Sequence, residues 1–295
     1  MGIVLGPNQY GKAEVRVVTV DRTGPEHRIA DLNVTTTLHG DFTDAHLHGD
    51  NAHVLATDTQ KNTVYAFARD GVGQIEQFGL RLARHFAGAY DWISGARVVI
   101  EQAPWARITV SGQPHPHAFT RPSGEVRTAA VTVEGDRCWV IAGLSGMVVL
   151  KSTGSEFAGF PRDRYTTLAE TDDRILATAV TARWRYAQPD VDYAGSFAAV
   201  RALLLQTFAG THSKALQQTL YAMGEAVLAG NPEVCEIKLS MPNRHHFLVD
   251  LEPFELDNPG CVYHAADRPY GLIEGTVRRD DAPDPGPAWD GVVGF

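Results

Sequence analysis

The chain has 295 residues, of which 44% are hydrophobic and 21% charged, close to the average of globular proteins. At about 150 residues per domain, this length predicts two domains or one duplicated domain, and the composition excludes disordered, collagen-like and disulfide-rich proteins. The 35 acidic and 26 basic side chains give a net charge of −9. This charge argues against nucleic acid or an anionic membrane as a partner, because both require a basic surface.

The cysteines and the hydropathy pattern indicate a cellular compartment. Cys138, Cys235 and Cys261 are odd in number and far apart, which predicts neither a disulfide framework nor a CxxC metal site. Such a set favours a reducing cytoplasm. The sequence contains no run of about 18 apolar residues and no signal-peptide pattern at its start. We therefore expect a cytoplasmic protein with no membrane span.

The first half of the chain alternates between strand-like and helix-like patterns. Alternating apolar and polar residues predict two strands that form a hairpin. Helices are predicted from the capping residues Thr57 and Asp58 and from the helical spacing of apolar residues between Ile75 and Phe86. Short Val- and Ile-rich runs then predict an antiparallel meander. The expected elements are strands at 14–20 and 27–40, a His-rich loop at 44–53, helices at 57–69 and 75–88, and the meander at 96–150.

The same order of elements starts again near residue 174, which predicts a duplicated α+β unit. Each unit would be an antiparallel sheet with its helices on one face. The expected elements are strands at 175–187, 234–241, 246–254 and 271–277 and helices at 193–208 and 213–228. The expected domains are a first unit at 1–150, a second unit at 151–278, and a flexible tail at 279–295. This acidic, proline-rich tail is not expected to pack a core.

Two histidine pairs raise the question of a metal. Asp44, His46 and His48 have the spacing of a zinc or copper site, but they also suit a solvent-exposed loop. His115 and His117 would lie on the same face of a strand, since side chains alternate with a period of two. No further ligands lie in register with either pair. No motif of a serine hydrolase, phosphate-binding loop, zinc protease or dinucleotide site occurs in the sequence.

Other candidate residues are scattered along the chain. Lys12 is either a surface cation or a buried base, and Thr57-Asp58 is either a plain helix cap or an anion site at a helix N-terminus. Arg174 is either a salt-bridge partner or a ligand-binding cation. Asn243 and His245 lie on the turn after a strand. Their spacing alone does not join these residues into one site.

Several short motifs contain these candidate residues. They are NQYGK at 8–12, TDTQKNT at 57–63, SEFAGF at 155–160, DRYTTL at 163–168, DRIL at 173–176 and MPNRH at 241–245. Together, and in this order, they resemble the motifs of the urate oxidase (uricase) family. The resemblance runs from about residue 5 to residue 278. It implies tandem T-fold units whose sheets close into a barrel on oligomerisation, and a homotetramer with active sites at its subunit interfaces.

The resemblance also implies an activity and a set of site residues. The reaction is the oxidation of urate by O2 to 5-hydroxyisourate with release of hydrogen peroxide, without a metal or an organic cofactor. Lys12, Thr57 and His245 would form a proton relay, with Lys12 as the base towards Thr57. Arg174 and Gln217 would clamp the purine, Phe157 would stack on it, and the Asp58 N–H would donate to it. Leu168, Leu216 and Ile273 would line the pocket. Asn243 would hold O2 or a water.

Two other functions remain open on the sequence alone. A metal-dependent cyclic amidohydrolase would use Asp44, His46 and His48. A non-catalytic purine-binding protein of the same fold would keep Arg174, Gln217 and Phe157 but would lack a working relay. The acidic, proline-rich tail stands where eukaryotic members often carry a peroxisomal tripeptide, and it favours a bacterial cytoplasmic enzyme.

Overall fold

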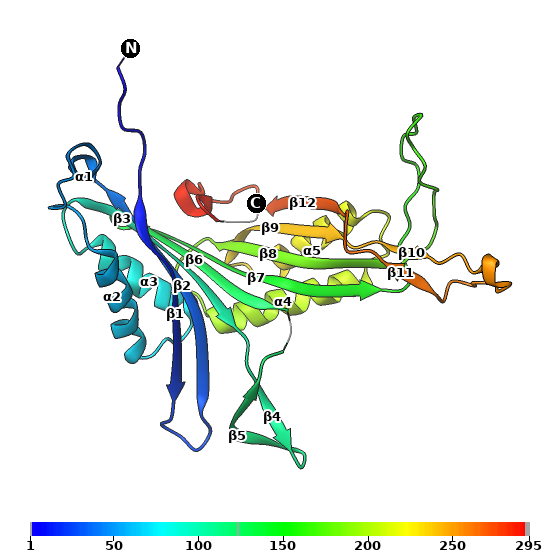
Figure 1. Ribbon diagram of the computed structural model, residues 1–295, viewed down its shortest axis with the longest axis horizontal. Helices are drawn as coiled ribbons and strands as arrows, with labels where there is room; N and C mark the ends of the chain where they lie inside the picture. The colour runs from blue at the N-terminus through cyan, green and yellow to red at the C-terminus, as the bar shows by residue number, and fades with distance from the viewer. Residues whose placement is uncertain (1, 123, 293–295) are drawn as a thin grey trace. The chain divides into compact units, whose positions relative to one another are not determined.

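The computed structural model describes residues 2–122 and 124–292 and divides them into two compact units (Figure 1). Unit 1 consists of the described parts of Met1–Gly143, Arg185–Ala194 and Pro283–Val292. Unit 2 consists, among the described residues, of Leu144–Trp184 and Gly195–Ala282. The change from one unit to the next falls inside strand β7. No helix in the described ranges is long and apolar enough to cross a membrane.

Unit 1 is an antiparallel sheet with helices on one face. Its strands follow the order β1-β2-β3-β6-β7, so that β1 lies at the edge. Helix α3 packs on β3 and β6, and α2 packs on β1. The elements are β1 Tyr10–Asp21, β2 Arg28–Gly40, α1 Thr43–His48, α2 Thr57–Arg69, α3 Ile75–Ala87, β3 Ile93–Ala103, β4 Ala106–Val110, β5 Gln113–Thr120, β6 Val126–Glu134 and β7 Arg137–Lys151.

The core of unit 1 lies between α3 and the sheet. The apolar stripe of this helix is fully buried, as its helical spacing predicts; its members are Ile75, Phe78, Leu82 and Phe86. Gly79 faces the sheet, and a Cβ atom there would lie 2.8 Å from Cγ2 of Val131. The glycine therefore allows a closer approach of α3 to β6 than any other residue would.

Unit 2 repeats this construction. Its strands follow the order β7-β8-β9-β12, with β12 at the edge. Helix α5 packs on β9 and β12, and the ring of Trp184 in β8 lies 5.8 Å from that of Phe197 in α4. A Cβ atom on Gly224 of α5 would lie 2.5 Å from Cγ2 of Val277 in β12. The elements are β8 Leu176–Tyr186, α4 Tyr193–Gly210, α5 Leu216–Gly230, β9 Val234–Asn243, β10 His246–Leu248, η1 Glu252–Phe254, β11 Tyr263–Ala265, β12 Gly271–Arg278 and η2 Gly286–Trp289, of which η2 belongs to unit 1.

The predicted α+β class, with antiparallel sheets and helices on one face, is confirmed. The four long helices occur where the sequence predicts them, although α5 begins at Leu216 rather than at residue 213. The His-rich segment is not a loop throughout, since residues 43–48 form the short helix α1. The Asp41 carboxylate accepts the N–H of Thr43 before this helix, and Gly49 ends it in the left-handed conformation.

Two predicted strand regions were wrong in part. The meander at 96–150 is interrupted, because β4 and β5 form a separate two-stranded sheet. The expected strand at 246–254 is only three residues long as β10, which pairs with β11 before the 3-10 turn η1. Pro253 cannot donate a ladder hydrogen bond, which limits a strand there.

The described part of the C-terminal segment is packed, contrary to the expectation of a flexible tail. Ala288 and Val292 are buried with Ala130 and Ile141 of the unit 1 sheet. The Arg97 guanidinium donates to the carbonyl of Pro287. Prolines reduce the entropy that this segment loses on ordering, and the two apolar side chains supply the buried surface. Residues 293–295 of the expected tail lie outside the described residues.

Candidate active site

Lys12 lies beside a bulge in the edge strand of unit 1. The register of β1 against β2 shifts between Lys12 and Val15, and Glu14 has a φ of 55°. The Glu14 N–H donates to the Thr35 hydroxyl at 3.0 Å, which holds the bulge in place. A bulge changes the direction of nearby side chains and is common beside active sites. Lys12 is half-buried. It lies next to the irregular stretch of the β1–β2 ladder.

The residue before Lys12 explains how closely the two strands approach. A Cβ atom on Gly11 would lie 1.8 Å from the carbonyl oxygen of Thr36. Only glycine fits this contact, so the NQYGK motif includes a residue that the backbone requires. Lys12 itself is opposite Thr36 in the β1–β2 ladder.

The start of α2 is anchored to the same position of β2. The Thr36 hydroxyl donates to Oε1 of the fully buried Gln60 at 2.8 Å, and Nε2 of Gln60 lies 3.4 Å from the carbonyl of Leu55. Thr57, half-buried, is the first residue of the helix. This anchor places Thr57 near the strand that carries Lys12.

Thr57 and Asp58 do not form the plain helix cap that was one interpretation of the sequence. The N-cap residue is Ala56, and no side chain caps the helix in this described segment. The Asp58 carboxylate accepts hydrogen bonds from Lys61 and Asn62 instead. These bonds and the charges of Lys61 and Lys12 lower the pKa of Asp58. The N-terminal N–H groups of α2 therefore have no side-chain acceptor and can donate to an anion.

In unit 2, Arg174 lies against an aromatic ring immediately before β8. Its guanidinium carbon is 5.1 Å from the ring centroid of Phe157. Burial lowers the pKa of Arg174, and its Nε atom is buried without a hydrogen-bond partner within the part of the chain that the structure describes. The salt bridge that the sequence allowed for Arg174 is not formed among these residues. An unpaired, half-buried cation over a ring is suited to a flat anion.

His245 belongs to the same group of side chains. Burial, and then the charge of Arg174, lower the pKa of His245, so its ring is neutral at pH 7. The Arg244 N–H donates to the carbonyl of Ala177 at 2.8 Å, which ties the end of β9 to the start of β8. Asn243 is the last residue of β9 and pairs with Gly271 of β12. The MPNRH and DRIL motifs thus meet at one end of the unit 2 sheet.

Phe157 is held between two neighbouring segments. It exchanges backbone hydrogen bonds with Thr171, at 2.8 and 3.1 Å. The preceding residues bond to Ser213, whose N–H donates to the carbonyl of Gly154 at 2.9 Å and whose carbonyl accepts from the Glu156 N–H at 2.8 Å. Because Ser213 closely precedes α5, these bonds bring Phe157 and the start of that helix together.

Three other expected substrate-binding residues, Leu216, Gln217 and Leu168, differ in how far their side chains are exposed. Leu216 is 2% exposed and packs in the core of unit 2, whereas Gln217 in the first turn of α5 is exposed. Leu168 is 51% exposed, and its carbonyl accepts a hydrogen bond from Arg162 at 2.8 Å. The roles of these three residues stay predictions.

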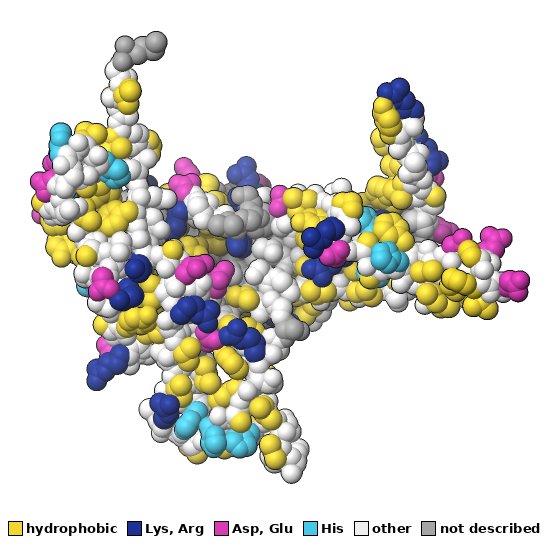
Figure 2. Space-filling view, in the orientation of Figure 1, with side chains coloured by type: hydrophobic (Ala, Val, Ile, Leu, Met, Phe, Trp, Pro, Cys, Tyr) yellow, Lys and Arg dark blue, Asp and Glu magenta, His cyan; other side chains and the backbone are white. Residues whose placement is uncertain are grey.

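The histidine pairs do not form a metal centre in the described ranges. No group of three or more His, Cys, Asp or Glu side chains there could hold an ion. Nδ1 of His46 bonds to the carbonyl of Phe42, and Nε2 of His48 is 4.0 Å from Asp44. The rings of His115 and His117 make an edge contact at 4.5 Å, in the group of histidines over β4 and β5 in Figure 2.

Sequence reasoning missed two residues that support the site. Gln60 occupies the buried face of α2 with Val64 and Ala68. A polar residue on an apolar helical stripe was the available signal for it. Asp173 accepts hydrogen bonds from the segment that leads to Phe157. No spacing in the sequence indicates this contact, since it joins residues about twenty positions apart in irregular segments.

Comparisons with known proteins agree with this geometry. The family model described as Uricase matches residues 8–132 and 140–274. The uricase of Arthrobacter globiformis is 58% identical over 293 residues, which are 99% of this chain and 96% of that protein. The uricase of Dictyostelium discoideum is 39% identical over an alignment of 278 positions, which covers 92% of this chain and 96% of that protein.

Solved structures show the same fold. The crystal structure of the Arthrobacter globiformis uricase has a TM-score of 0.94 and covers 98% of this chain and 99% of that chain. The crystal structure of a uricase from Bacillus fastidious, at 24% identity, has a TM-score of 0.81 over 95% of this chain and 96% of that chain. At that identity the likeness shows the fold alone.

Proposed function

Because this chain belongs to the uricase family, we propose that it is a urate oxidase and that each of its two units contributes residues to active sites. The enzyme oxidises urate with O2 and is an oxidoreductase. Neither the amidohydrolase nor the binding-only alternative is favoured, since the relatives at 58% and 39% identity are both uricases. The observation that carries the site assignment is the position of Arg174 over Phe157, with its buried Nε atom unpartnered among the described residues and with neutral His245 nearby.

The proposed reaction follows from balance of atoms and electrons. Urate loses two electrons and two protons, and O2 takes them up as hydrogen peroxide. Both atoms of O2 leave in the peroxide, so the hydroxyl group of 5-hydroxyisourate comes from water. A deprotonated purine is itself electron-rich, and the proposed reaction therefore uses no metal and no organic cofactor. The protein has to bind urate, remove a proton and hold O2 close.

Each part of the site has a proposed role in this scheme. Lys12 acts as the base towards Thr57, and the Thr57 hydroxyl passes on the proton of urate. Neutral His245 takes up a proton from this relay and gives it back. Arg174 pairs with the anionic edge of the purine, and Phe157 stacks on its plane. The remaining binding residues are Gln217 as the second half of the clamp, Asp58 through its N–H, Asn243 at the O2 position, and Leu168 and Leu216 as lining.

We also propose a homotetramer in which sheets of two chains close into a barrel. In each unit the sheet ends in an edge strand, β1 in unit 1 and β12 in unit 2. These edges carry exposed apolar side chains, with Val18 at 59% and Leu272 at 59% exposure. An uncovered edge strand is a template for pairing with another chain. The active site would then combine Lys12 and Thr57 of one chain with Arg174 of another.

Two further assignments remain proposals. The cytoplasm is the proposed location, supported by three free cysteines and the negative charge. The duplicated unit is proposed to divide near residue 150, as the repeated order of elements indicates.

The test of the function is urate turnover in air with purified full-length protein and excess chelator. Loss of the ultraviolet absorbance of urate, with an equal amount of peroxide formed, is the expected result. Turnover abolished by chelator would contradict the cofactor-free reaction. Tight urate binding without turnover would instead support the binding-only function.

A further inference from the structure

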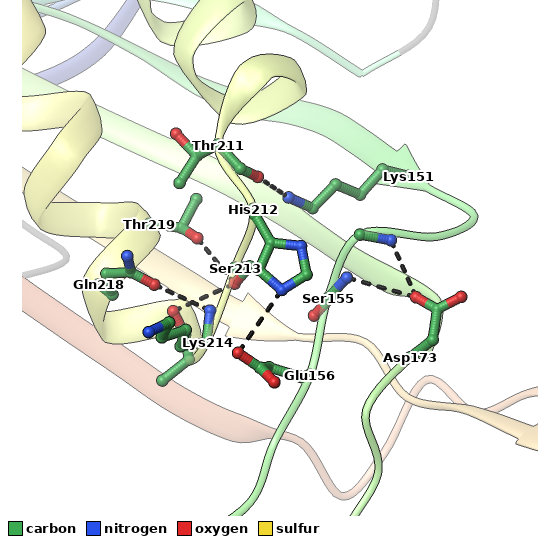
Figure 3. Close-up of polar contacts among 12 residues, drawn as sticks. Lys151, Ser155, Glu156, Asp173, Thr211, His212, Ser213, Lys214, Gln218 and Thr219 are labelled. Carbon is green, nitrogen blue, oxygen red and sulfur yellow. Dashed lines mark hydrogen bonds and ion pairs between the residues drawn. The ribbon is translucent and has the colours of Figure 1, made fainter.

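Asp173 makes a set of contacts that the proposed reaction does not itself require. Its Oδ2 accepts a hydrogen bond from the Thr153 hydroxyl at 2.7 Å. Its Oδ1 accepts the backbone N–H of Gly154 at 2.9 Å and lies 3.5 Å from that of Ser155 (Figure 3). The carboxylate thus spans three consecutive residues of the segment that follows β7.

These contacts join the two segments that carry the proposed urate clamp. Phe157 follows the bonded residues by two positions, and Arg174 follows Asp173 directly. The Thr171 hydroxyl donates to the Asp173 carbonyl at 2.6 Å, which fixes the backbone on the other side of the carboxylate. The two segments are joined by the backbone bridge between Phe157 and Thr171, and the contacts of Asp173 add a side-chain link beside it.

We propose that Asp173 is a positioning residue for urate binding, which acts by holding the Phe157 segment against Arg174. This inference rests on the proposed function, since it assigns urate as the ligand of the clamp. The carboxylate does not touch the substrate. It places the ring and the guanidinium 5.1 Å apart, in the arrangement that receives a planar anion.

The ionised form of Asp173 suits this role. Hydrogen bonds from the Thr153 hydroxyl and from backbone N–H groups lower the pKa of the carboxyl group. An ionised carboxylate accepts on both oxygens, and such charge-assisted bonds are stronger than neutral ones. The hydrogen bonds therefore persist throughout the neutral pH range.

The segment that leads to Phe157 is also bonded on the side opposite Asp173. The same segment bonds to Ser213 on its other side, and Glu156 lies 3.5 Å from Nε2 of His212. The Thr219 hydroxyl donates to that of Ser213 at 2.8 Å, and Gln218 accepts the N–H of Lys214 at 2.8 Å. The Ser213 side is therefore secured by α5, and on the side towards Arg174 the side chain of Asp173 acts together with the Phe157–Thr171 backbone bridge.

The test compares steady-state kinetics of the full-length wild type with those of Asp173→Ala and Asp173→Asn. Asp173→Ala loses every acceptor, and we expect KM for urate to rise about tenfold with kcat nearly unchanged, because the lost geometry serves binding rather than proton transfer. Asp173→Asn keeps one acceptor oxygen and should recover most of the wild-type KM. A merely destabilised protein would lose active enzyme, which lowers apparent kcat and leaves KM unchanged.

Asp21→Ala is the matched control. Asp21 accepts the N–H and hydroxyl of Thr23 in the β1–β2 turn, and these bonds lower its pKa, so it makes similar contacts in unit 1. Its KM should equal that of the wild type. An unchanged KM in Asp173→Ala, or an Asn variant as impaired as the Ala variant, would overturn the proposal.

Amide hydrogen exchange separates this inference from the proposed function. Asp173→Ala should speed exchange of the Gly154 N–H whether or not the protein oxidises urate. If wild type lacks turnover, the proposed function and the assignment of urate both fail, even if exchange reveals the contact. If wild type is active and Arg174→Ala raises KM while Asp173→Ala changes neither KM nor exchange, the positioning role alone fails.

Discussion

The two units share one construction but hold their candidate residues by different means. In each unit a glycine of one helix, α3 in unit 1 and α5 in unit 2, faces a valine of the sheet: Gly79 faces Val131, and Gly224 faces Val277. In unit 1, Lys12 and Thr57 lie on an edge strand and a helix start. In unit 2, Arg174 and Phe157 lie on irregular segments between β7 and β8. The shared scaffold therefore explains the cores, whereas side-chain contacts specific to each unit explain the site.

The two units also have different proposed roles in the reaction. In the proposed mechanism, unit 1 supplies Lys12 and Thr57 of the proton relay, which must be reactive. Unit 2 supplies the cation and the ring, which must be held in one geometry. Substitutions in the two units should consequently alter different kinetic constants, and this expectation can be tested directly.

The largest expected effect is on the relay in unit 1. Lys12→Ala and Thr57→Ala should each lower kcat by about 100-fold or more, which is the usual contribution of a positioned acid or base. Steady-state urate oxidation measures this loss. Thr63→Ala is the control, since Thr63 is a half-buried threonine of the same helix whose hydroxyl donates to the carbonyl of Thr59. Near-wild-type turnover in both relay variants would remove them from the mechanism.

The next effect tests whether the parts supplied by the two units come from different chains. Lys12→Ala and Arg174→Ala should each be strongly impaired alone at urate concentrations below KM, but their co-assembly should restore activity. When each site takes one part from each of two chains, random mixing returns about one quarter of the sites. Co-expression followed by the urate assay measures the recovery. No recovery, with mixed oligomers demonstrated by differently tagged chains, would contradict a site shared between subunits.

A smaller effect should distinguish the two helix–sheet contacts. A Cβ atom would lie 2.5 Å from Val277 at Gly224 and 2.8 Å from Val131 at Gly79. Both alanine variants should lose about 1–3 kcal/mol of stability from overpacking, with the larger loss at Gly224. Thermal unfolding of the assembled protein provides the measurement.

Gly210 is the control for these two substitutions. Nothing lies within 4 Å of a Cβ atom at this last residue of α4. Gly210→Ala should therefore be neutral or mildly stabilising, because alanine has the higher helix propensity. A greater loss at Gly79 than at Gly224 would show that unit 1 is the more tightly packed of the two.

The sequence predicted the regular elements of both units well, because their periodicity follows from burial. The buried stripe of α3 is an example, and so is the helix at 193–208. The β4–β5 sheet and helix α1 were missed, since short elements are decided by contacts that periodicity does not encode. The packed C-terminal segment was missed because composition does not show that two apolar side chains have a surface to cover.

The candidate site was predictable only through the resemblance of dispersed motifs. No local pattern indicates that Arg174 lies over Phe157, or that burial and Arg174 lower the pKa of His245. These relations depend on segments that tertiary contacts hold, such as the hydrogen bonds of Asp173. Spacing describes a residue's neighbours on its own element, and the site is assembled from several elements.

The smallest expected effect is electrostatic and lies within unit 2. Burial is the main cause of the lowered pKa of His245, and the positive charge of Arg174 is the second. A nearby cation disfavours the protonated ring, so Arg174→Gln should raise the pKa of His245. It should stay below 6.5, because the burial remains. NMR titration of the ring C–H signal measures the shift, with the signal identified by its loss in His245→Gln.

Arg164→Gln is the control for this charge effect, since the exposed Arg164 donates to Tyr165 and is not among the causes of the lowered pKa. Its His245 pKa should match that of wild type. A pKa unchanged in Arg174→Gln would separate His245 from the clamp. A rise would place the relay histidine and the urate-binding cation in one electrostatic site, so that anion binding at Arg174 would itself raise the proton affinity of His245. Binding of urate in unit 2 would then prepare its own proton acceptor, whereas Lys12 and Thr57 of unit 1 act on the proton that urate loses.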